Sequence, residues 1–331
     1  MRHQYIERKT GRVITESLYG DRVIGFIYSD IREKMPFLFR VLTGKGASWI
    51  LGFLNFDSIL ASNLSGNHLK RLGIDYDECL EPSSALNSLR KIFERKIRYW
   101  DCRPMPDDTA TVVSPSDSRV LIGAFSKESL LFIKGKFFSY KDILGDGKGE
   151  WLSYFDGGYF AVFRLTPEKY HYNHTSVAGI VVDHYEVCGI YHSCNPSAVV
   201  ELCTPYSKNR RVVTIIDTDV KGGSRVGLVA MVEVVALMIG RIFQCYSEEG
   251  YDDPRPVMPG MFLKKGCPKS LFRPGSSTVV LIFQKDRIIF SQDLIRNLHR
   301  PEVESLFSCG LGIKVVETDV NVRSAIGHAS V

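Results

Sequence analysis

The sequence predicts an α+β fold in which a helical N-terminal region, residues 1–105, precedes a β-rich domain, residues 106–331. Two observations carry this prediction. Before residue 101 the apolar residues recur at helical spacings, whereas after residue 111 short runs of Val, Ile, Phe and Tyr alternate with Gly, Pro, Asn and Asp turns. The length of 331 residues fits one large domain or two of ordinary size.

Three apolar segments lie in the N-terminal region. Residues 32–43 have mixed helical spacings, and Pro36 restricts any helix there to starting near that residue. Residues 32–43 and 49–60 form either an ordinary pair of core helices or an amphipathic surface that rests on a bilayer. Residues 88–99 are the clearest helix, with one apolar face and a basic remainder, and residues 101–106, with two prolines, end it.

Short apolar runs predict the strands of the β-rich domain. Residues 226–239 are longer and fit either a strand or a buried helix. The other runs, each bounded by turn residues, span residues 111–113, 159–165, 179–182, 212–217, 278–283 and 314–318.

Composition excludes several classes of protein. Hydrophobic residues make up 44% and charged residues 24%, which excludes disordered and fibrous chains. The net charge of +5 is too small and diffuse to indicate a nucleic-acid partner, and we expect none. No apolar window reaches the ~18–20 residues of a membrane span, and the N-terminus lacks a signal peptide, so we expect a cytoplasmic protein. Eight cysteines without a C-x-x-C pair indicate reduced thiols and no metal site.

Polar residues stand out in three segments of the β-rich domain. Asp117 lies in a Ser/Pro turn after a strand, where an aspartate usually caps the local backbone. His171 and His174 lie among aromatic residues and are candidate metal ligands, acid–base groups or structural histidines. Ser276 and Ser277 form a tight turn that leads into an apolar strand, and such a turn alone indicates only a β-turn.

Together and in this order, the three segments resemble the phosphatidylserine decarboxylase family. Members of that family have an S-P-x-D-G turn, a Y-H-R-x-H segment and a G-S-T or G-S-S turn near the C-terminus. Residues 93–104 are similar to the family's F-x-R…R-P stretch, residues 209–212 to its N-x-R-V and residues 232–234 to its V-E-V. The resemblance extends from about Phe93 to Phe283.

The resemblance implies an enzyme that makes its own cofactor, a pyruvoyl group, from a serine. The serine hydroxyl attacks the preceding carbonyl, and the resulting ester eliminates to leave the pyruvoyl group on the new small chain, beside the large chain. By the family's pattern His174 is the base and Asp117 is its partner. The pyruvoyl carbonyl then forms a Schiff base with the substrate amine, and His171 assists decarboxylation or reprotonation at Cα.

The position of cleavage has two readings. A Gly-Ser pattern places it before Ser276, whereas the family's Ser-Thr pair ahead of an apolar strand matches Ser277 and Thr278. The second pattern favours Ser277 as the precursor of the pyruvoyl group, with Ser276 as the alternative.

Three functions are compatible with this resemblance. The first is conversion of phosphatidylserine to phosphatidylethanolamine and CO2 at a membrane surface that the chain contacts peripherally. The second is a soluble decarboxylase of apolar or aromatic amino acids, because the Arg that follows the first histidine in the family is missing here. The third is a non-catalytic homologue, which the retained Asp117, His171, His174 and serine pair disfavour. A homodimer stays an open option.

Overall fold

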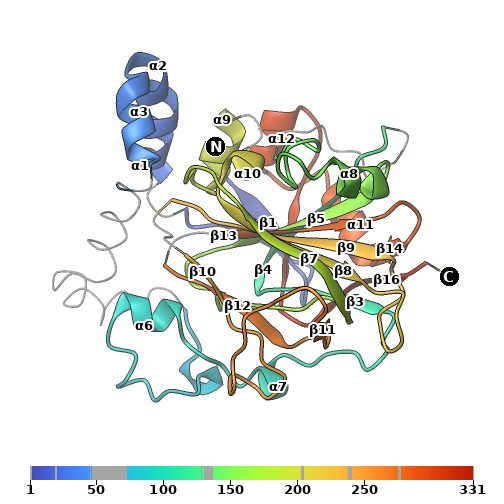
Figure 1. The fold of residues 1–331 in the computed structure, drawn as a ribbon. Coiled ribbons are helices and arrows are strands. Elements are labelled where there is room, and N and C mark those ends of the chain that lie inside the picture. Colours follow the sequence, from blue (N-terminus) through green and yellow to red (C-terminus); the bar gives the residue numbers. More distant parts are fainter. Residues whose placement is uncertain are drawn as a thin grey trace.

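The computed structural model describes residues 2–18, 21–44, 46, 73–127, 129, 137–202, 205–237, 241–274 and 277–330. Figure 1 shows a β-rich body with most of its helices gathered on one side and three short N-terminal helices that project from it. The predicted α+β fold with a β-rich second part is confirmed. The apolar stretch 49–60 lies outside the described residues.

A ten-stranded sheet forms the centre of the molecule, in the order β11–β7–β8–β9–β13–β5–β4–β15–β1–β2. Neighbouring strands are antiparallel except β1 and β15, which pair in parallel. The strands are β1 (Gln4–Glu7), β2 (Val13–Thr15), β4 (Ser118–Ala124), β5 (Tyr159–Leu165), β7 (Gly179–Val187), β8 (Arg211–Asp217), β9 (Leu228–Val234), β11 (Phe262–Leu263), β13 (Ser277–Phe283) and β15 (Glu317–Val320).

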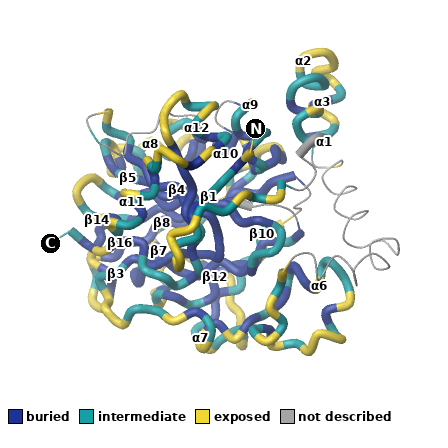
Figure 2. Tube along the Cα trace, turned by 180° about the vertical axis from the view of Figure 1, so that it is seen from behind, coloured by how far each residue is buried: buried dark blue, intermediate teal, exposed yellow. Residues whose placement is uncertain are grey.

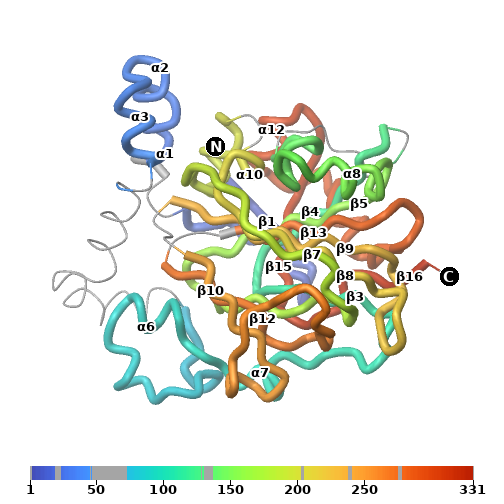
Figure 3. Tube along the Cα trace, in the orientation of Figure 1, coloured from blue at the N-terminus to red at the C-terminus, as the bar shows by residue number. Residues whose placement is uncertain are grey.

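Strand β13 lies in the interior of this sheet, between β9 and β5 (Figure 3). It pairs with β5 along its whole length, from Ser277 opposite Leu165 to Phe283 opposite Tyr159. Residues 279–283 are fully buried, because other elements cover both faces of the sheet here. This explains why the strand reads as an unbroken apolar run rather than as an alternating pattern.

Two three-stranded sheets accompany the large one. The first has the order β10–β12–β6 and carries the two candidate histidines at and next to β6. The second has the order β14–β16–β3. Their strands are β10 (Ile242–Gln244), β12 (Pro268–Phe272), β6 (Tyr172–His174), β14 (Ile288–Phe290), β16 (Ala325–Ala329) and β3 (Thr111–Val113).

The helices are short and cover the sheets rather than forming a layer of their own. Figures 1 and 2 show α8, α9, α10 and α12 on the same side of the large sheet, with the buried residues concentrated in the strands. The helices are α1 (Asp21–Phe26), η1 (Ile27–Ile31), α2 (Arg32–Lys34), α3 (Pro36–Leu42), η2 (Tyr76–Glu78), α6 (Leu89–Phe93), α7 (Tyr99–Cys102), α8 (Gly149–Phe155), α9 (Pro196–Glu201), α10 (Pro205–Lys208), α11 (Gln292–Leu298) and α12 (Leu306–Leu311).

The N-terminal helical segment, residues 21–44, packs on α9. Tyr28 and Phe39 form a small apolar cluster with Ala198 and Leu202, separate from the main core. The hydroxyl of Tyr28 accepts a hydrogen bond from the backbone N–H of Ser193 at 2.6 Å. The break at Met35, just before Pro36, agrees with the predicted start of a helix near that proline.

Two features of the N-terminal region differ from the prediction. The first strands, β1 and β2, lie in what was expected to be a helical region, and they extend the large sheet. The helix expected at residues 88–99 ends at Phe93, because Ile97 forms a β-bridge with Cys79. The boundary near residue 105 stays a prediction, and the partly helical N-terminal region also contributes two short strands to the large sheet.

The strand predictions are more accurate. Each of the six apolar runs lies in or overlaps an observed strand, with the last one shifted to β15. The ambiguous run at residues 226–239 contains a strand, β9, and not a helix in its described part.

A buried ionic cluster joins the N-terminal segment of the chain to strands β4, β5 and β15. The Arg164 guanidinium on β5 donates to Glu317 on β15, at 2.9 and 2.5 Å, and to Glu16, at 3.0 and 2.7 Å. His3 lies 2.9 Å from Glu317, and Arg119 pairs with Glu16. The oxygens and imidazole nitrogen are close enough to coordinate a metal ion, but the two guanidinium groups already neutralise the carboxylates.

Candidate active site

Asp117 is buried in the turn between β3 and β4, with 4% of its surface exposed. The guanidinium of Arg103 donates to both of its carboxylate oxygens, from Nε at 3.0 Å and from Nη2 at 2.8 Å. The backbone N–H of Val322 donates to Oδ1 at 2.8 Å. Arg103 also donates to Glu78, with both bonds at 2.8 Å. Asp117 therefore connects the segment before β3 to the C-terminal part of the chain.

Two opposing effects act on the pKa of Asp117. Burial raises the pKa, but the charge and hydrogen bonds of Arg103 lower it by more, so the pKa lies below its ordinary value. The carboxylate is therefore ionised at neutral pH. A bidentate guanidinium contact of this kind is strong and directional, which fixes the carboxylate in one orientation.

His174 is completely buried at the end of β6. Its Nδ1 lies 2.8 Å from the carbonyl oxygen of Gly266, and its Nε2 lies 3.0 Å from the hydroxyl of Tyr170. Burial is the largest cause that lowers the pKa of His174, to about 3. The imidazole is therefore neutral at physiological pH and keeps one unprotonated nitrogen, which is the state that a general base requires.

His171 is also completely buried, directly before β6. Its ring stacks on Phe93 of α6, with centroids 3.4 Å apart, and neither ring nitrogen makes a hydrogen bond with a described residue. Burial, followed by the nearby charge of Arg95, holds its pKa well below the ordinary value. Arg95 in turn donates to the carbonyl oxygens of Glu168 and Lys169 and so holds the backbone that leads to His171.

The two candidate serines lie at the edge of the described structure. Ser276 is outside the described residues, and only the backbone of Ser277 is described, as the first residue of β13. Ser277 pairs with Leu165, the last residue of β5. On the other side of the turn, the N–H of Phe272 donates to the carbonyl of His171 at 3.1 Å. The backbone on both sides of the turn is thus held against residues 165–171.

The structure brings the three segments together but does not join Asp117 to His174. Asp117 bonds to Arg103 and Val322, whereas the His174 ring bonds to Gly266 and Tyr170. Asp117 is close enough to raise the pKa of His174 through its charge, but the expected direct hydrogen bond is absent. The roles assigned to these residues by the resemblance stay predictions.

A buried ion pair next to the histidines was not predicted as part of the site. Lys269 on β12 donates to Glu233 on β9 at 2.7 Å, and both side chains are wholly buried. Ser270 donates to Glu233 as well, and the amide of Asn173 on β6 donates to Ser270 at 3.0 Å. Burial raises the pKa of Glu233, but Lys269 and these hydrogen bonds lower it by more. A charged residue inside an apolar strand is the sequence pattern that could have indicated this pair.

Comparisons with known proteins identify the family. The family model described as "Phosphatidylserine decarboxylase" matches residues 89–303, a range that includes Asp117, both histidines and both serines. The phosphatidylserine decarboxylase proenzyme of Fusobacterium nucleatum is 28% identical over 295 residues, which cover 89% of this chain and 91% of the relative. That of Chlamydia trachomatis is 31% identical over 297 residues, which cover 88% and 90%.

A plant relative extends the similarity beyond bacteria. The phosphatidylserine decarboxylase proenzyme 2 of Oryza sativa subsp. japonica is 32% identical over 247 residues, which cover 73% of this chain and 36% of the relative. With a family match over most of the chain and more than 30% identity over 88% of it, this protein belongs to the phosphatidylserine decarboxylase family.

Proposed function

We propose that this chain is the precursor of a phosphatidylserine decarboxylase that cleaves itself before Ser277. The observation that carries the proposal is the position of the processing turn, whose two sides are held against the histidine segment at Leu165 and His171. The relatives are named as proenzymes, which agrees with a chain that is processed after synthesis. Their names also favour a phospholipid over a free amino acid as the substrate.

Self-cleavage needs a serine hydroxyl, a base and a carbonyl carbon. In the proposed reaction the Ser277 hydroxyl attacks the carbonyl carbon of Ser276, and the peptide C–N bond breaks as an ester forms. His174, neutral and buried, takes the hydroxyl proton and passes it to the nitrogen that leaves. Elimination then releases the carboxylate of Ser276, and hydrolysis of the new N-terminus releases ammonia and leaves the pyruvoyl group. Residues 277–331 become the small chain.

The residues around the new N-terminus fit a pyruvoyl group. His171 is buried beside the turn with two ring nitrogens that lack hydrogen bonds to the described residues, so its ring can bond to a group there. Once formed, the pyruvoyl group supplies an electrophilic carbonyl that accepts the electrons released as CO2 leaves. His171 is proposed to assist decarboxylation or reprotonation at the substrate Cα, and Arg95 holds the backbone that positions it.

Intact-mass analysis of the purified protein tests this proposal. We expect two chains, of residues 1–276 and 277–331, with the small chain blocked by a pyruvoyl group. The preparation should release CO2 from phosphatidylserine vesicles, and borohydride should abolish the activity because it reduces the carbonyl. A chain of full mass that is nevertheless active would contradict the proposal, and a small chain that begins at residue 276 would move the cleavage to the alternative position.

Peripheral contact with a membrane is the second part of the proposal. The N-terminal helical segment exposes Phe26, Met35, Phe37 and Val41, with Phe37 80% exposed. Neighbouring large apolar side chains of this kind indicate an interaction surface, and the exposed Arg40 adds positive charge for anionic headgroups. Among the described residues, no helix has the length and apolar character that crossing a membrane requires.

Substitution of Met35 and Phe37 by glutamate is expected to weaken binding to phosphatidylserine vesicles by roughly tenfold or more, since burial of each side chain contributes about 1.5–3 kcal/mol. Vesicle flotation measures the bound fraction. Met258 is 55% exposed on another part of the molecule, so Met258→Glu is a matched control that should bind like the natural chain. Equal binding by the double variant and the control would rule out this segment as the contact.

A further inference from the structure

His174 lies at the inner end of a chain of hydrogen bonds between two tyrosines. The Tyr170 hydroxyl lies 3.0 Å from Nε2 of His174 and 2.7 Å from the hydroxyl of Tyr251. The hydroxyl of Tyr251 in turn lies 3.1 Å from the backbone nitrogen of Ile97 and 2.9 Å from its carbonyl oxygen. Tyr170 is completely buried, so these contacts are made away from solvent.

The direction of each hydrogen bond follows from the groups at the two ends. The carbonyl oxygen of Gly266 can only accept, so Nδ1 of His174 carries a proton. In the neutral imidazole Nε2 is then an acceptor, and Tyr170 must donate to it. Because the Tyr170 proton is used in this bond, Tyr251 donates to Tyr170 and accepts from the N–H of Ile97.

His174 can take a proton at Nε2 once the Tyr170 hydroxyl turns away from that nitrogen, and the same atoms then stabilise the protonated ring. Nε2–H then donates to the oxygen of Tyr170, Tyr170 donates to Tyr251, and Tyr251 donates to the carbonyl of Ile97. Only two hydroxyl groups have to rotate, and no group loses its partner. A hydrogen bond from a charged imidazole is stronger than one from a neutral donor, so the reversed chain favours the protonated state.

Among the other groups around the ring, none is a carboxylate that bonds directly to His174. Asp117, the partner expected from the family's pattern, directs its carboxylate at Arg103 and Val322. Tyr99 packs edge-on against the His174 ring, with centroids 4.7 Å apart. After burial, the charges of Arg323 and Arg103 lower the pKa of His174, whereas the Gly266 carbonyl and the charge of Asp117 raise it.

The anchor on the far side of the ring is fixed by the backbone. Gly266 has a φ of +76°, a left-handed conformation that favours glycine. A Cβ atom there would lie 2.3 Å from Sδ of Met105. Nδ1 is thus held by a carbonyl whose orientation depends on this glycine, and the adjustable contacts of the ring are those of Nε2.

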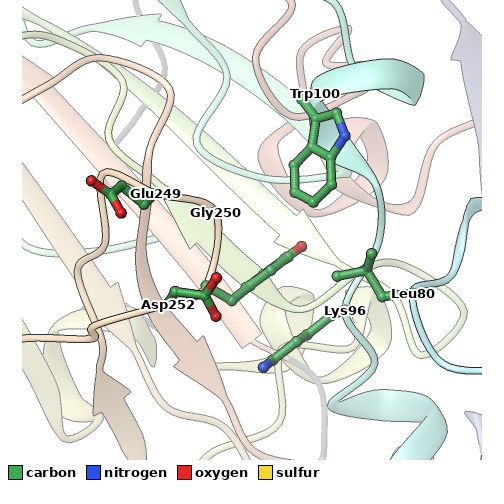
Figure 4. A pocket seen from close by; sticks show the side chains of 7 residues that line it. Leu80, Lys96, Trp100, Glu249, Gly250 and Asp252 are labelled. Atoms are coloured by element: carbon green, nitrogen blue, oxygen red, sulfur yellow. The ribbon is translucent and has the colours of Figure 1, made fainter.

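The outer end of the chain reaches the protein surface. Tyr251 lines a surface pocket of about 410 Å³ together with Leu80, Lys96, Trp100 and Asp252. Figure 4 shows these labelled side chains around the opening, and the ammonium group of Lys96 lies 5.3 Å from the centroid of the Tyr251 ring. The pocket gives the tyrosine pair a solvent-accessible end, whereas His174 itself has none.

We propose that Tyr170 and Tyr251 are positioning residues for His174, which hold its Nε2 in place and accept its hydrogen bond once it is protonated. The inference rests on the proposed function, in which His174 is the base of self-cleavage. The place of the carboxylate that bonds the N–H nitrogen of other catalytic histidines is taken here by the Gly266 carbonyl, and the tyrosine pair acts at the opposite nitrogen.

Conversion of each tyrosine to phenylalanine removes one oxygen atom and keeps the ring. We expect Tyr170→Phe to slow self-cleavage by roughly 10–100-fold and Tyr251→Phe by roughly 3–10-fold, less than the roughly 10²–10⁴-fold that general-base catalysis contributes, because the imidazole itself stays in place. Tyr172→Phe is the matched control, because the Tyr172 ring contacts both tyrosines while its hydroxyl makes no hydrogen bond with a described residue. The rate is that at which the full chain, made by cell-free translation, converts into two chains.

A nitrogen resonance distinguishes positioning from a structural effect. In the uncleaved Ser277→Ala chain with 15N-labelled histidine, we expect the Nε2 resonance of His174 to shift in the Tyr170→Phe variant and to stay unchanged in the Tyr172→Phe variant. His174→Ala separates the two proposals. If that variant is not cleaved while both tyrosine variants behave like the control, the inference about the tyrosines is wrong and the function of His174 stands. If His174→Ala is cleaved normally, the proposed function of His174 fails first.

Discussion

Replacement of Ser277 by alanine is expected to leave the protein as one uncleaved chain of 331 residues without decarboxylase activity. Alanine has no hydroxyl group to attack the preceding carbonyl, and no pyruvoyl group can form from it. Loss of an attacking serine slows covalent catalysis by roughly 10⁴-fold or more, so intact-mass analysis should find no small chain after prolonged incubation. Release of CO2 from phosphatidylserine vesicles is the second measurement.

Ser276→Ala is the matched control, because it removes the neighbouring hydroxyl and leaves Ser277 in place. We expect this variant to be cleaved and active. The reverse pattern, with Ser277→Ala cleaved and Ser276→Ala intact, would show that the chain is cut before residue 276. Cleavage of both variants at the natural rate would mean that neither serine is the nucleophile.

Replacement of Arg164 by alanine is expected to lower the free energy of unfolding by about 3–5 kcal/mol, the usual cost of removing one partner from a buried ion pair. Without this guanidinium, Glu16 and Glu317 remain buried with only Arg119 and His3 beside them. Urea unfolding of the uncleaved Ser277→Ala chain measures the change, because a single chain unfolds in a unimolecular step.

A surface arginine provides the comparison for Arg164. Arg210 pairs with Glu186 at 2.5 Å, with the two side chains 28% and 47% exposed, so Arg210→Ala should lower the free energy of unfolding by under about 1 kcal/mol.

The free energies of unfolding of the two variants should also respond differently to a fall in pH. Burial raises the pKa of Glu317, but Arg164 and His3 lower it by more, so that the pKa is about 2. Its stabilising contribution is complete above about pH 4.5, the ordinary range of a glutamate, and is lost as the pH falls towards 2.

Loss of Arg164 should therefore remove much of this acid-sensitive stability, because the pKa of Glu317 then moves back towards its ordinary value. The Arg210→Ala variant should keep the acid dependence of its parent chain. Equal unfolding free energies and equal pH profiles for the two variants would contradict a stabilising role for the buried cluster.

The sequence predicted the strands better than the helices, and the reason is physical. Strands such as β5 and β13 are buried on both faces, so their apolar runs are visible without knowledge of their partners. Strand β1 is only four residues long, and its parallel partner β15 lies more than 300 residues further along the chain. Nothing local could indicate that pairing. The helix at residue 88 was overextended because the bridge between Ile97 and Cys79 is likewise a tertiary contact.

In the candidate site, too, the local sequence patterns could be predicted and the tertiary contacts could not. The order of Asp117, His171 and His174 along the chain was enough to suggest the family, and the structure brings these segments together. The partners of their side chains could not be predicted, since Arg103 competes for Asp117 and Tyr170 occupies the nitrogen of His174. Tyr251 was not singled out at all, because it lies 77 residues from His174 in a loop without a distinctive pattern.

The position of β13 has a consequence for how the mature protein persists. If the chain is cleaved before Ser277 as proposed, an interior strand of the large sheet belongs to one polypeptide, and its neighbours β5 and β9 belong to another. Refolding from the denatured state is then a second-order reaction, so the midpoint of the unfolding transition depends on protein concentration. Each separated chain also exposes unpaired strand edges. Only the precursor encodes the whole fold in a single molecule. The lifetime of the mature enzyme is therefore set by how slowly its two chains unfold and separate, rather than by an equilibrium that can be restored.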